Sequence, residues 1–346
     1  MSRCTPMSKS ILIIGYYGSD NLGDELLLKE TLKLITPHVD RARIKVLSYH
    51  VDQTKRFHDV QGVSRNKPSQ IFRAILGADI IIGGGGSMLQ NVTSNRSLMY
   101  YLSLINFGLL LKKKVVLLGN GIGPIRGEFQ TRLVKRTLDR IDYLHLRDKD
   151  SYDWIDGSKK EHIHLGQDLA LENSTENADI KRNNVIINLR MWKSVDALIG
   201  VVKPFIHYVE KKGYTVTCLS MQDGNDDKAM VDLGQVKTFE TLEALEEEVR
   251  TSRFAIAMRL HTLILCSNFG VPFIGLSYDP KVSTFCRQMD MPYFESFESL
   301  SFQDLVKSFD LLEANETVYV SELQEKMSTI DSKMDPVKSF LCNLLE

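Results

Sequence analysis

The chain has 346 residues and a mass of 39.4 kDa, above the roughly 250 to 300 residues at which a single hydrophobic core stops growing. Hydrophobic residues make up 43% and charged residues 25% of the sequence, which excludes a disordered or fibrous chain. The formal net charge is -1, so no overall field favours binding to nucleic acid or to an anionic membrane. We therefore expect a two-domain globular protein without a nucleic-acid partner.

The cysteines and the apolar stretches favour a cytoplasmic protein. The 5 cysteines lie far apart and form no CxxC motif, which argues for a reducing compartment and against a structural zinc site, so no metal is expected. The apolar run from Ile11 continues into GYYGSDN without a signal-peptide cleavage site. The longest apolar stretch, residues 98–111, is too short to span a membrane, but the lysines at 112–114 would suit lipid headgroups.

Strands and helices alternate along the first half of the chain. Helical spacing predicts helices from residue 24 onward and over residues 97–111 and 126–140. Short apolar runs predict strands between these helices, over residues 10–15, 44–48, 79–82, 115–119 and 143–146. Such alternation is typical of a parallel sheet covered by helices on both faces.

The polar stretch over residues 167–184 predicts a domain boundary. A second series of elements follows, with helices over residues 194–212 and 240–250 and amphipathic helix from residue 301. Its strands are predicted over residues 185–189, 214–219, 254–258 and 271–275. We expect three parts: an N-terminal domain at 1–175, a C-terminal domain at 180–300 and C-terminal helices at 301–346. The fold class is α/β, with two doubly wound Rossmann-like domains facing a cleft, as in the glycosyltransferase-B architecture, and a C-terminal helical tail.

The first candidate loop is GYYGSDNLGDE, which follows the first strand. Ligands of α/β sheets bind at the carboxyl ends of the strands, so the loops after the strands are where a site is expected. Asp24 stands at a helix N-terminus and is interpreted either as the helix cap or as a general base toward a sugar hydroxyl. Asp20 and Asn21 are weaker candidates.

The second candidate loop, IIGGGGSMLQNVTSNRS, contains four consecutive glycines after a strand. Their backbone amides would approach an anion or a sugar, and the alternative is a tight turn. The spacing matches neither a dinucleotide site nor a Walker site, because the lysine and the downstream ribose carboxylate are not in place.

Three further loops carry basic residues or glycines at strand ends. The third is GNGIGPI. In the fourth, LHLRDKDS, Arg147 is either a surface ion pair with Asp148 or a clamp for carboxylate or phosphate. In the fifth, AIAMRLHTLIL, Arg259 and His261 begin a helix and combine a cation, an imidazole and a helix dipole, which suits an anionic donor.

Additional basic residues follow two other strands of the second half. Lys281 stands in SYDPK, although a solvated lysine is the alternative. Arg190, Trp192 and Lys193 come directly after the first strand of that half. We expect them to extend a basic wall around the donor.

With these loops identified, the chain resembles the polysaccharide pyruvyl transferase family. The resemblance rests on GYYGSDNLGDE, IIGGGGSMLQNVTSNRS, GNGIGP, LRDKDS, and MRLHTLI with GVPFIGLSYDPKV, in this order, and covers about residues 11–293. Asn91 departs from it, since an aspartate is expected after the Gln in family members. A proton-transfer role would be lost there, while hydrogen bonding to a sugar could persist.

The resemblance implies transfer of a pyruvyl group from phosphoenolpyruvate to two hydroxyls of one sugar, giving a cyclic ketal. Phosphoenolpyruvate is a co-substrate, and no cofactor is expected. The donor carries a carboxylate and a phosphate and therefore needs several cations. We expect it to bind Arg147, Arg259, Leu260, His261, Lys281 and Arg190.

A mechanism follows as a hypothesis. His261 protonates the donor or stabilises the departing phosphate, and Asp24 is the base on the acceptor hydroxyl. The resemblance implies an acceptor sugar in a cell-wall, capsular or exopolysaccharide precursor, often lipid-linked, which would bring the protein to the cytoplasmic face of the membrane. We expect the acceptor to bind Gly18, Asn21, Gly86, Ser87, Gln90 and Asn91.

Two alternatives remain open. One is a nucleotide-sugar-dependent glycosyltransferase of the same fold, although the second half shows no obvious carboxylate after a strand to hold ribose hydroxyls. The other is a non-catalytic sugar-binding relative, because fold and motif are only a prior on function.

Overall fold

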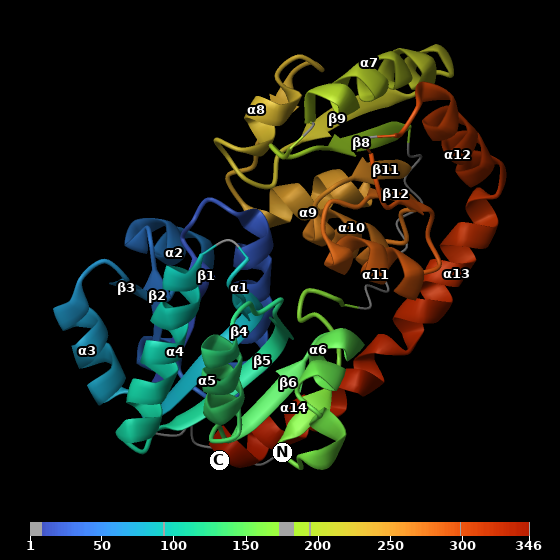
Figure 1. Cartoon of the computed structure of the whole chain (residues 1–346). Coiled ribbons are helices and arrows are strands. Elements are labelled where there is room, and N and C mark those ends of the chain that lie inside the picture. Colours follow the sequence, from blue (N-terminus) through green and yellow to red (C-terminus); the bar gives the residue numbers. More distant parts are fainter. Residues whose placement is uncertain (1–8, 93, 173–182, 194, 298, 346) are drawn as a thin grey trace, which may run out of the picture. The chain divides into compact units, whose positions relative to one another are not determined.

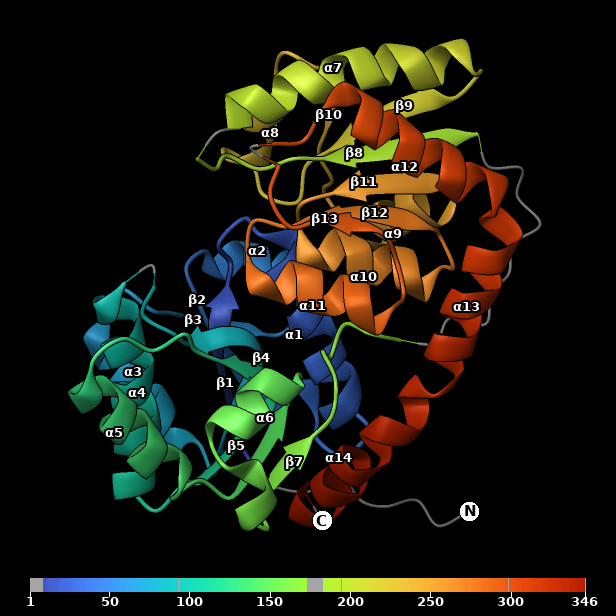
Figure 2. The ribbon, with the colours of Figure 1, turned by 45° about the vertical axis from the view of Figure 1, so that its right-hand side comes forward.

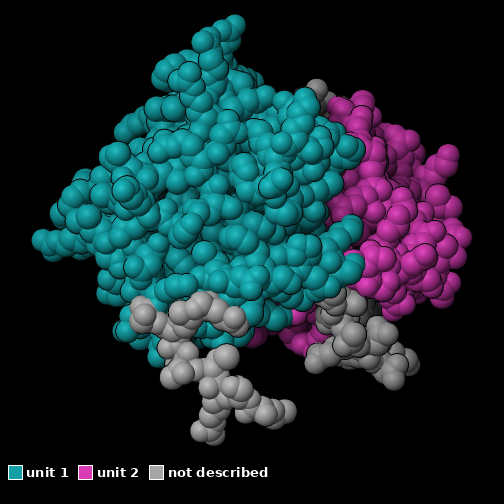
Figure 3. All heavy atoms as spheres, turned by 90° about the horizontal axis from the view of Figure 1, so that it is seen from below, with its two compact units in different colours: residues 1–169, 332–346 teal, residues 170–331 magenta. Residues whose placement is uncertain are grey.

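The structure is a computed structural model that describes residues 9–92, 94–172, 183–193, 195–297 and 299–345 (Figure 1). The chain forms two compact units, one of residues Met1–Leu169 with Ser332–Glu346 and one of residues Ala170–Asp331 (Figure 3). The boundary expected at 175–180 lies in residues 173–182, outside the described residues.

The first unit is built on a seven-stranded sheet in the order β3-β2-β1-β4-β5-β6-β7. All of its strand pairs are parallel. Its strands are β1 (Ile11–Tyr17), β2 (Ile44–Ser48), β3 (Gln61–Ser64), β4 (Ile80–Leu89), β5 (Lys114–Ile122), β6 (Tyr143–Leu146) and β7 (Ile163–Leu165). The strand order reverses between β1 and β4, and such a reversal opens a crevice beyond the carboxyl ends of the strands.

Helices cover both faces of this sheet. They are α1 (Leu22–Ile35), α2 (Val51–His58), α3 (Pro68–Gly77), α4 (Asn95–Leu110), α5 (Glu128–Leu138), α6 (Lys149–Trp154) and α14 (Ile330–Leu345), with short 3-10 turns η1 (Arg41–Arg43) and η2 (Gly157–Lys159). On one face, α3, α4 and α5 bury residues such as Leu102 and Leu138 against Leu117 of β5 (Figure 1). Helix α1 packs on β4 from the other face, so β4 is covered on both of its faces.

The second unit repeats this architecture on a six-stranded parallel sheet in the order β10-β9-β8-β11-β12-β13. Its strands are β8 (Asn184–Asn188), β9 (Thr215–Leu219), β10 (Val236–Lys237), β11 (Phe254–Ala257), β12 (Phe273–Leu276) and β13 (Tyr293–Phe294). The order reverses between β8 and β11. Residues that follow β8, β11 and β12 therefore meet at the middle of the carboxyl edge.

The helices of the second unit also form two layers. They are α7 (Val195–Lys211), α8 (Asp226–Met230), α9 (Leu242–Arg250), α10 (Leu260–Asn268), α11 (Pro280–Gln288), α12 (Phe302–Ala314) and α13 (Glu316–Ser328). Figure 2 shows α7 and α12 on one face of the sheet and α9, α10 and α11 on the other. The ring of Phe309 in α12 lies 5.4 Å, between ring centroids, from Phe205 of α7 and from Phe254 of β11. These contacts join α12 and α7 to the core of the second unit.

The prediction of two Rossmann-like halves is confirmed, and the structure corrects several elements. The third predicted strand, over residues 79–82, is the fourth strand of the structure, β4, because α2, β3 and α3 lie before it and were not predicted. The strands β7, β10 and β13 were also missed. These strands are two to four residues long, and β3 (QGVS) and β10 (VK) carry little apolar pattern. The segment 301–346 is divided, since residues 332–346 belong to the first unit. There Phe340 stacks on Tyr143 with ring centroids 4.0 Å apart.

None of the helices in the described part of the chain is long and apolar enough to cross a membrane. The lysines at 112–114 precede or begin β5, at the amino edge of the first sheet. Lys113 donates to the carbonyl oxygen of Leu76 at 2.9 Å, and Lys114 binds Asp142 at 2.7 Å. The residues expected to bind the acceptor lie at or after the carboxyl ends of β1 and β4, at the opposite edge of the same sheet. Lipid contact through these lysines stays a prediction.

Candidate active site

Asp24 lies in the first turn of α1, next to the residue that caps this helix. The N-cap is Asn21, whose Oδ1 accepts a hydrogen bond from the backbone nitrogen of Gly23 at 3.2 Å. The interpretation of Asp24 as the cap is therefore wrong. The Asn21 side chain instead donates to Asp24 Oδ2 at 2.6 Å, and the helix N-terminus favours a negative charge at this place. Asn21 thus orients a half-buried carboxylate at the carboxyl edge of the sheet.

The four glycines lie in a strand and not in a loop. β4 continues through them to Leu89, which corrects the expectation of a ligand loop or tight turn. A Cβ atom at Gly84 would lie 2.5 Å from Thr31 Oγ1, and one at Gly85 would lie 2.7 Å from a methyl carbon of Leu27. The glycines therefore let α1 pack directly on β4. Gly86 differs, since its added Cβ would lie 3.7 Å from Asp24 Oδ1, which places its backbone beside that carboxylate.

A buried carboxylate and imidazole hold the loop that contains Gly18. The Gly18 backbone nitrogen donates to Glu25 Oε1 at 2.7 Å, and Glu25 Oε2 lies 2.7 Å from His58 Nε2. Both side chains are almost fully buried. Gly18 has a φ of +66°, and an added Cβ would lie 2.7 Å from the backbone nitrogen of His50, so a larger residue has no room. Sequence reasoning missed Glu25 and His58, although Glu25 directly follows Asp24 in the motif.

Arg147 directly follows β6 and is bound by two carboxylates. Its Nη1 lies 3.2 Å from Asp168 Oδ2, and its Nε lies 3.3 Å from Asp148 Oδ2. The side chain is only 8% exposed, so the ion pair with Asp148 is not the surface pair considered as an alternative. Nη2 donates to Ser87 Oγ at 3.0 Å. The structure thus joins Arg147, expected to bind phosphoenolpyruvate, to Ser87, expected to bind the sugar. The contact of Arg147 with Asp168 was not predicted from the sequence.

Asn91 joins its loop to the segment before α5, whereas Gln90 makes a hydrogen bond within its own loop. The Asn91 amide donates to Asn95 Oδ1 at 2.7 Å and to the carbonyl oxygen of Arg126 at 2.8 Å, and its oxygen accepts from the Arg126 nitrogen at 2.7 Å. An aspartate could not make the two donations, which explains the amide at this position. Gln90 Oε1 accepts from the backbone nitrogen of Val92 at 2.8 Å. The contacts of Asn91 brace the loop, and a sugar contact stays a prediction.

In the second unit, Arg259 precedes α10 and binds the buried carboxylate of Asp226. Its Nε lies 3.0 and 3.2 Å from the two carboxylate oxygens, and Nη2 donates to Gln222 Oε1 at 2.8 Å. The Arg259 side chain is 10% exposed and that of Asp226 is fully buried. Because the pair is removed from water, it fixes the guanidinium at the carboxyl edge of the sheet.

Asp226 was not singled out from the sequence. It is the first residue of α8, in the segment after β9, and its side chain is buried against Arg259. That the second half has no obvious carboxylate after a strand to hold ribose hydroxyls stays a prediction. Asp226 Oδ2 also accepts from the backbone nitrogen of Met221 at 3.0 Å and from Asn188 Nδ2 at 3.3 Å. The carboxylate is engaged by Arg259 and by its own loop. A possible signal was the polar run QDGNDD after a predicted strand.

Arg190, Trp192 and Lys281 gather around Tyr278. Arg190 Nη1 donates to the Tyr278 hydroxyl at 2.8 Å, and its guanidinium carbon lies 4.8 Å from the centre of the Tyr278 ring and 5.4 Å from that of Trp192. Lys281 Nζ lies 5.9 Å from the Tyr278 ring and 3.8 Å from Asp279 Oδ2. Arg190 Nε is buried and has no hydrogen-bond partner among the described residues. Part of the expected basic wall is therefore assembled.

Leu260 and His261 are the first residues of α10. Leu260 is buried and His261 is half-buried. Since β8, β11 and β12 are adjacent and parallel, the residues that follow them reach the same edge of the sheet. The strands that end at this edge are thus followed by three cations and one imidazole, those of Arg190, Arg259, Lys281 and His261. This set can bind a small dianion and exchange a proton with it.

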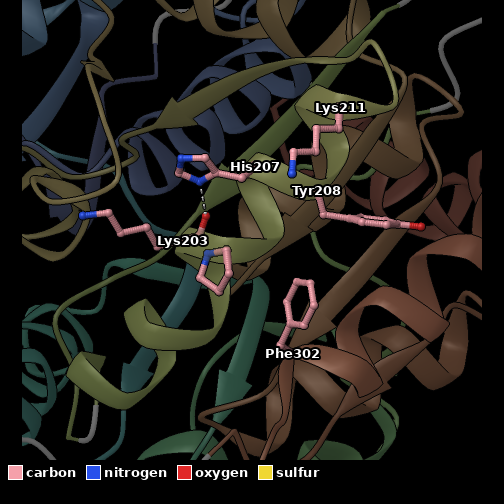
Figure 4. Close-up of a pocket in the computed structure, with 6 residues that line it drawn as sticks. Lys203, His207, Tyr208, Lys211 and Phe302 are labelled. Carbon is pink, nitrogen blue, oxygen red and sulfur yellow. Dashed lines mark hydrogen bonds between the residues drawn. The ribbon is translucent and has the colours of Figure 1, made fainter.

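A shallow pocket lies elsewhere in the second unit (Figure 4). It has a volume of about 480 Å³ and is lined by Lys203, Pro204, His207, Tyr208, Lys211 and Phe302. These residues belong to α7 and α12, which cover a face of the sheet and not its carboxyl edge. None of the candidate residues lines it. Within the described part of the chain, no group of three or more His, Cys, Asp or Glu side chains is placed to hold a metal ion.

Comparisons with known proteins agree on a family and on a fold. The family model described as polysaccharide pyruvyl transferase matches residues 21–280. The amylovoran biosynthesis protein AmsJ of Erwinia amylovora is 23% identical over 316 residues, covering 80% of this chain and 75% of that protein.

Two solved structures resemble the chain at low sequence identity. A putative UDP-N-acetylglucosamine 2-epimerase of Listeria monocytogenes has a TM-score of 0.62 and 11% identity, covering 92% of this chain and 91% of its own. The Anabaena protein Alr3699/HepE, in complex with UDP-glucose, has a TM-score of 0.59 and 13% identity, covering 97% and 99%. These likenesses show the fold.

Proposed function

Because the chain belongs to the polysaccharide pyruvyl transferase family, we propose that it moves a pyruvyl group from phosphoenolpyruvate to two hydroxyls of one sugar, forming a cyclic ketal. The sugar belongs to a cell-surface polysaccharide or to its lipid-linked precursor. The protein acts in the cytoplasm and meets the membrane only peripherally.

The observation that carries the proposal is the set of cations at the carboxyl edge of the second sheet. Phosphoenolpyruvate presents a carboxylate and a phosphate on a small frame, and planar guanidinium groups bind both in a bidentate manner. Arg259 is oriented by Asp226, and Arg190 by the Tyr278 hydroxyl. This arrangement supports donor binding by the second unit, with Leu260 contributing backbone contacts at the start of α10.

The reaction requires an acid and a base. His261 donates a proton to the methylene carbon of the donor or stabilises the leaving phosphate, and the first sugar hydroxyl then bonds to the central carbon. The bond between the central carbon and the bridging oxygen of the phosphate breaks, and the second sugar hydroxyl bonds to the same carbon and closes the ring. Of the two hydroxyl protons, one replaces the proton given to carbon and the other leaves with phosphate. Asp24 accepts a proton from an acceptor hydroxyl, held in position by Asn21.

The acceptor binds the carboxyl edge of the first unit. Asp24 and the backbone of Gly86 lie side by side there, and Ser87 is held by Arg147. Gly18 and Asn21 complete this edge from the loop before α1. We propose that these residues contact the sugar that receives the pyruvyl group.

The test combines the purified protein, phosphoenolpyruvate and a panel of sugar precursors. We expect phosphate release that depends on an acceptor, together with a product whose mass has increased by one pyruvyl ketal. His261→Ala and Arg259→Ala should abolish both signals, while His207→Ala, an exposed histidine on α7, should retain them. Binding of a nucleotide sugar without any binding of phosphoenolpyruvate would instead support a glycosyltransferase.

A further inference from the structure

A second cluster of aromatic and basic side chains lies at the carboxyl edge of the first sheet. Arg65 directly follows β3 and Tyr49 directly follows β2. Tyr16 is next to the last residue of β1, while Tyr100 and Tyr101 lie in the second turn of α4. We call these five residues the Arg65 cage. None of them is among the residues expected from the sequence to bind donor or acceptor.

The four tyrosine rings surround the guanidinium group. Its central carbon lies 3.9 Å from the centre of the Tyr49 ring and 4.5 Å from that of Tyr100. The rings of Tyr16 and Tyr101 are 5.6 and 5.7 Å away. Arg65 Nη1 also donates to the Tyr101 hydroxyl at 3.3 Å, and this hydroxyl donates to the carbonyl oxygen of Gly15 at 2.9 Å. Stacked rings and a hydrogen bond together fix the position of the cation.

The cage has hydrogen-bonding groups without partners. Among the described residues no carboxylate forms an ion pair with Arg65, whereas Arg147 and Arg259 each bind at least one. Its guanidinium has five donor hydrogens and makes one side-chain hydrogen bond in the described part of the chain. The Tyr100 hydroxyl is buried and lacks a partner there as well. Buried polar groups are normally satisfied, so a half-buried cation beside an unpaired hydroxyl indicates a site for an anion.

The cage adjoins the proposed acceptor residues. The pKa of Tyr49 is raised chiefly by burial, and the Asp24 carboxylate adds to this rise while Arg65 opposes it, so both charges act on the same ring. The backbone of Gly18 packs against His50, the neighbour of Tyr49. The cage and the proposed base therefore face one region at the carboxyl edge of the first sheet.

We propose that the Arg65 cage binds an anionic oxygen group, a phosphate or a carboxylate, that the acceptor carries beside the sugar that is pyruvylated. The inference rests on the proposed function and names its acceptor class: a glycosyl phosphate or an acidic sugar, and not a neutral one. Arg65 supplies the charge, Tyr100 donates a hydrogen bond, and the ring of Tyr49 offers an apolar face to the sugar.

Binding of matched probes by the full-length protein tests the proposal. Isothermal titration would compare free hexoses, the corresponding hexose 1-phosphates and the corresponding hexuronic acids. We expect at least one class of anionic probe to bind more tightly than the neutral sugar, and the tighter class identifies the anion. Arg65→Gln should weaken binding of that probe about 10- to 100-fold and leave the weak binding of the neutral sugar unchanged. Tyr100→Phe, which removes one hydroxyl and keeps the ring, should weaken it about 3- to 10-fold.

The matched control is Arg56→Gln, which removes the same charge from an exposed position on α2. It should bind every probe as the wild type does. Binding of phosphoenolpyruvate is measured in each variant, because it reports on folding and tests the proposed function separately. If the wild type does not bind phosphoenolpyruvate, the proposed function is refuted. The sugar titrations would still decide whether the Arg65 cage binds an anion.

Three results would overturn the inference. One is equal affinity of the wild type for neutral and anionic probes, and another is no binding of any probe at millimolar concentration. The third is an Arg65→Gln protein that melts at a lower temperature but binds the anionic probe as the wild type does, since the cage would then serve packing alone. If Arg65→Gln does not fold, Tyr100→Phe decides by the same comparison.

Discussion

At the scale of single residues, buried carboxylates decide how the arginines of the site are held. Asp168 binds Arg147, and Asp226 binds Arg259, each within a largely buried pair. Removing one partner of such a pair is costly, because the remaining charge is left buried and uncompensated. The positions of Arg147 and Arg259 therefore depend on the carboxylates of Asp168 and Asp226.

Asp226→Asn tests this dependence. The amide keeps the size of the side chain but removes the charge that orients Arg259. We expect the kcat/KM for phosphoenolpyruvate to fall about tenfold or more, mainly through a higher KM, and the free energy of unfolding to fall by about 1 to 3 kcal/mol. Steady-state kinetics and urea unfolding measure the two effects. Asp232→Asn, at an exposed position of the same unit, should change neither; an unchanged KM in Asp226→Asn would refute the positioning role.

A buried histidine of β6 predicts how stability depends on pH. The side chain of His145 accepts a hydrogen bond at Nδ1 from the Gly119 backbone nitrogen at 3.0 Å. Burial, with a further contribution from His164, lowers the pKa of His145 to about 4, although Asp168 opposes the shift. Between about pH 6.5 and about pH 4, the side chain of His145 binds a proton in the unfolded chain but not in the folded chain. Acid in this range therefore destabilises the fold, by about 3 kcal/mol from this residue.

His145→Asn should remove this contribution, because the amide oxygen can still accept from Gly119 but does not titrate. The variant is expected to lose less stability than the wild type as the pH falls from about 6.5 to about 4. Urea unfolding at a series of pH values gives both slopes, and His50→Asn at an exposed position should keep the wild-type slope. Equal slopes for His145→Asn and the wild type would contradict the assignment.

At the scale of elements, close packing of α1 on β4 sets the position of Asp24. Thr31 and Leu27 of α1 occupy the space where side chains would stand at Gly84 and Gly85. The helix consequently begins with its N-terminus at the end of β1, with Asn21 and Asp24 at the carboxyl edge. Glycine lowers the stability of a strand through its backbone entropy, and here the close packing of α1 that it permits offsets this loss.

Gly84→Ala should therefore destabilise the first unit. The new methyl group would lie 2.5 Å from Thr31 Oγ1 and 2.6 Å from the Tyr17 hydroxyl, and overpacking of this kind costs about 1 to 3 kcal/mol. Gly77→Ala, in α3, meets no atom within 4 Å and should be neutral or slightly stabilising. Urea unfolding measures both, and equal stability of the two variants would contradict close packing.

At the scale of the whole molecule, the end of the chain stabilises the unit in which the chain begins. The buried residues Val337, Leu341 and Leu345 belong to the first unit, and Phe340 stacks on Tyr143 of β6. Lys9 also donates to the carbonyl oxygen of Leu344 at 2.6 Å. The C-terminal residues thus cover part of the first sheet.

Phe340→Ala is expected to destabilise the first unit by about 1 to 3 kcal/mol, because it removes a half-buried ring and the stacking contact of that ring with Tyr143. Hydrogen exchange should show faster exchange in β6 and unchanged exchange in β8 and β11 of the second unit. Phe129→Ala, whose side chain is 67% exposed on α5, is the control and should alter neither. Faster exchange in the second unit alone would show that the C-terminal residues act elsewhere.

Much of the architecture could be predicted because its signals are local. Apolar runs such as ILIIG and the buried β5 segment identify strands directly, and their alternation with helices indicates parallel sheets. The edge strands β3, β10 and β13 could not be predicted, because two to four residues carry too little periodicity. The ends of the central strands could also be located from these runs, although the four glycines predicted as a loop lie within β4.

The sequence by itself determined the two Rossmann-like units, the family, and the strands after which Asp24, Arg147, Arg259 and His261 follow. These properties follow from residue types at short spacings. Only the tertiary structure decided what surrounds these residues: Asp226 lies 33 positions from Arg259, and Tyr101 lies 36 positions from Arg65. Charges, rings and glycines act over a few ångströms, so their partners depend on which strands and helices pack side by side. That packing joins distant positions of the chain, and no local pattern records it.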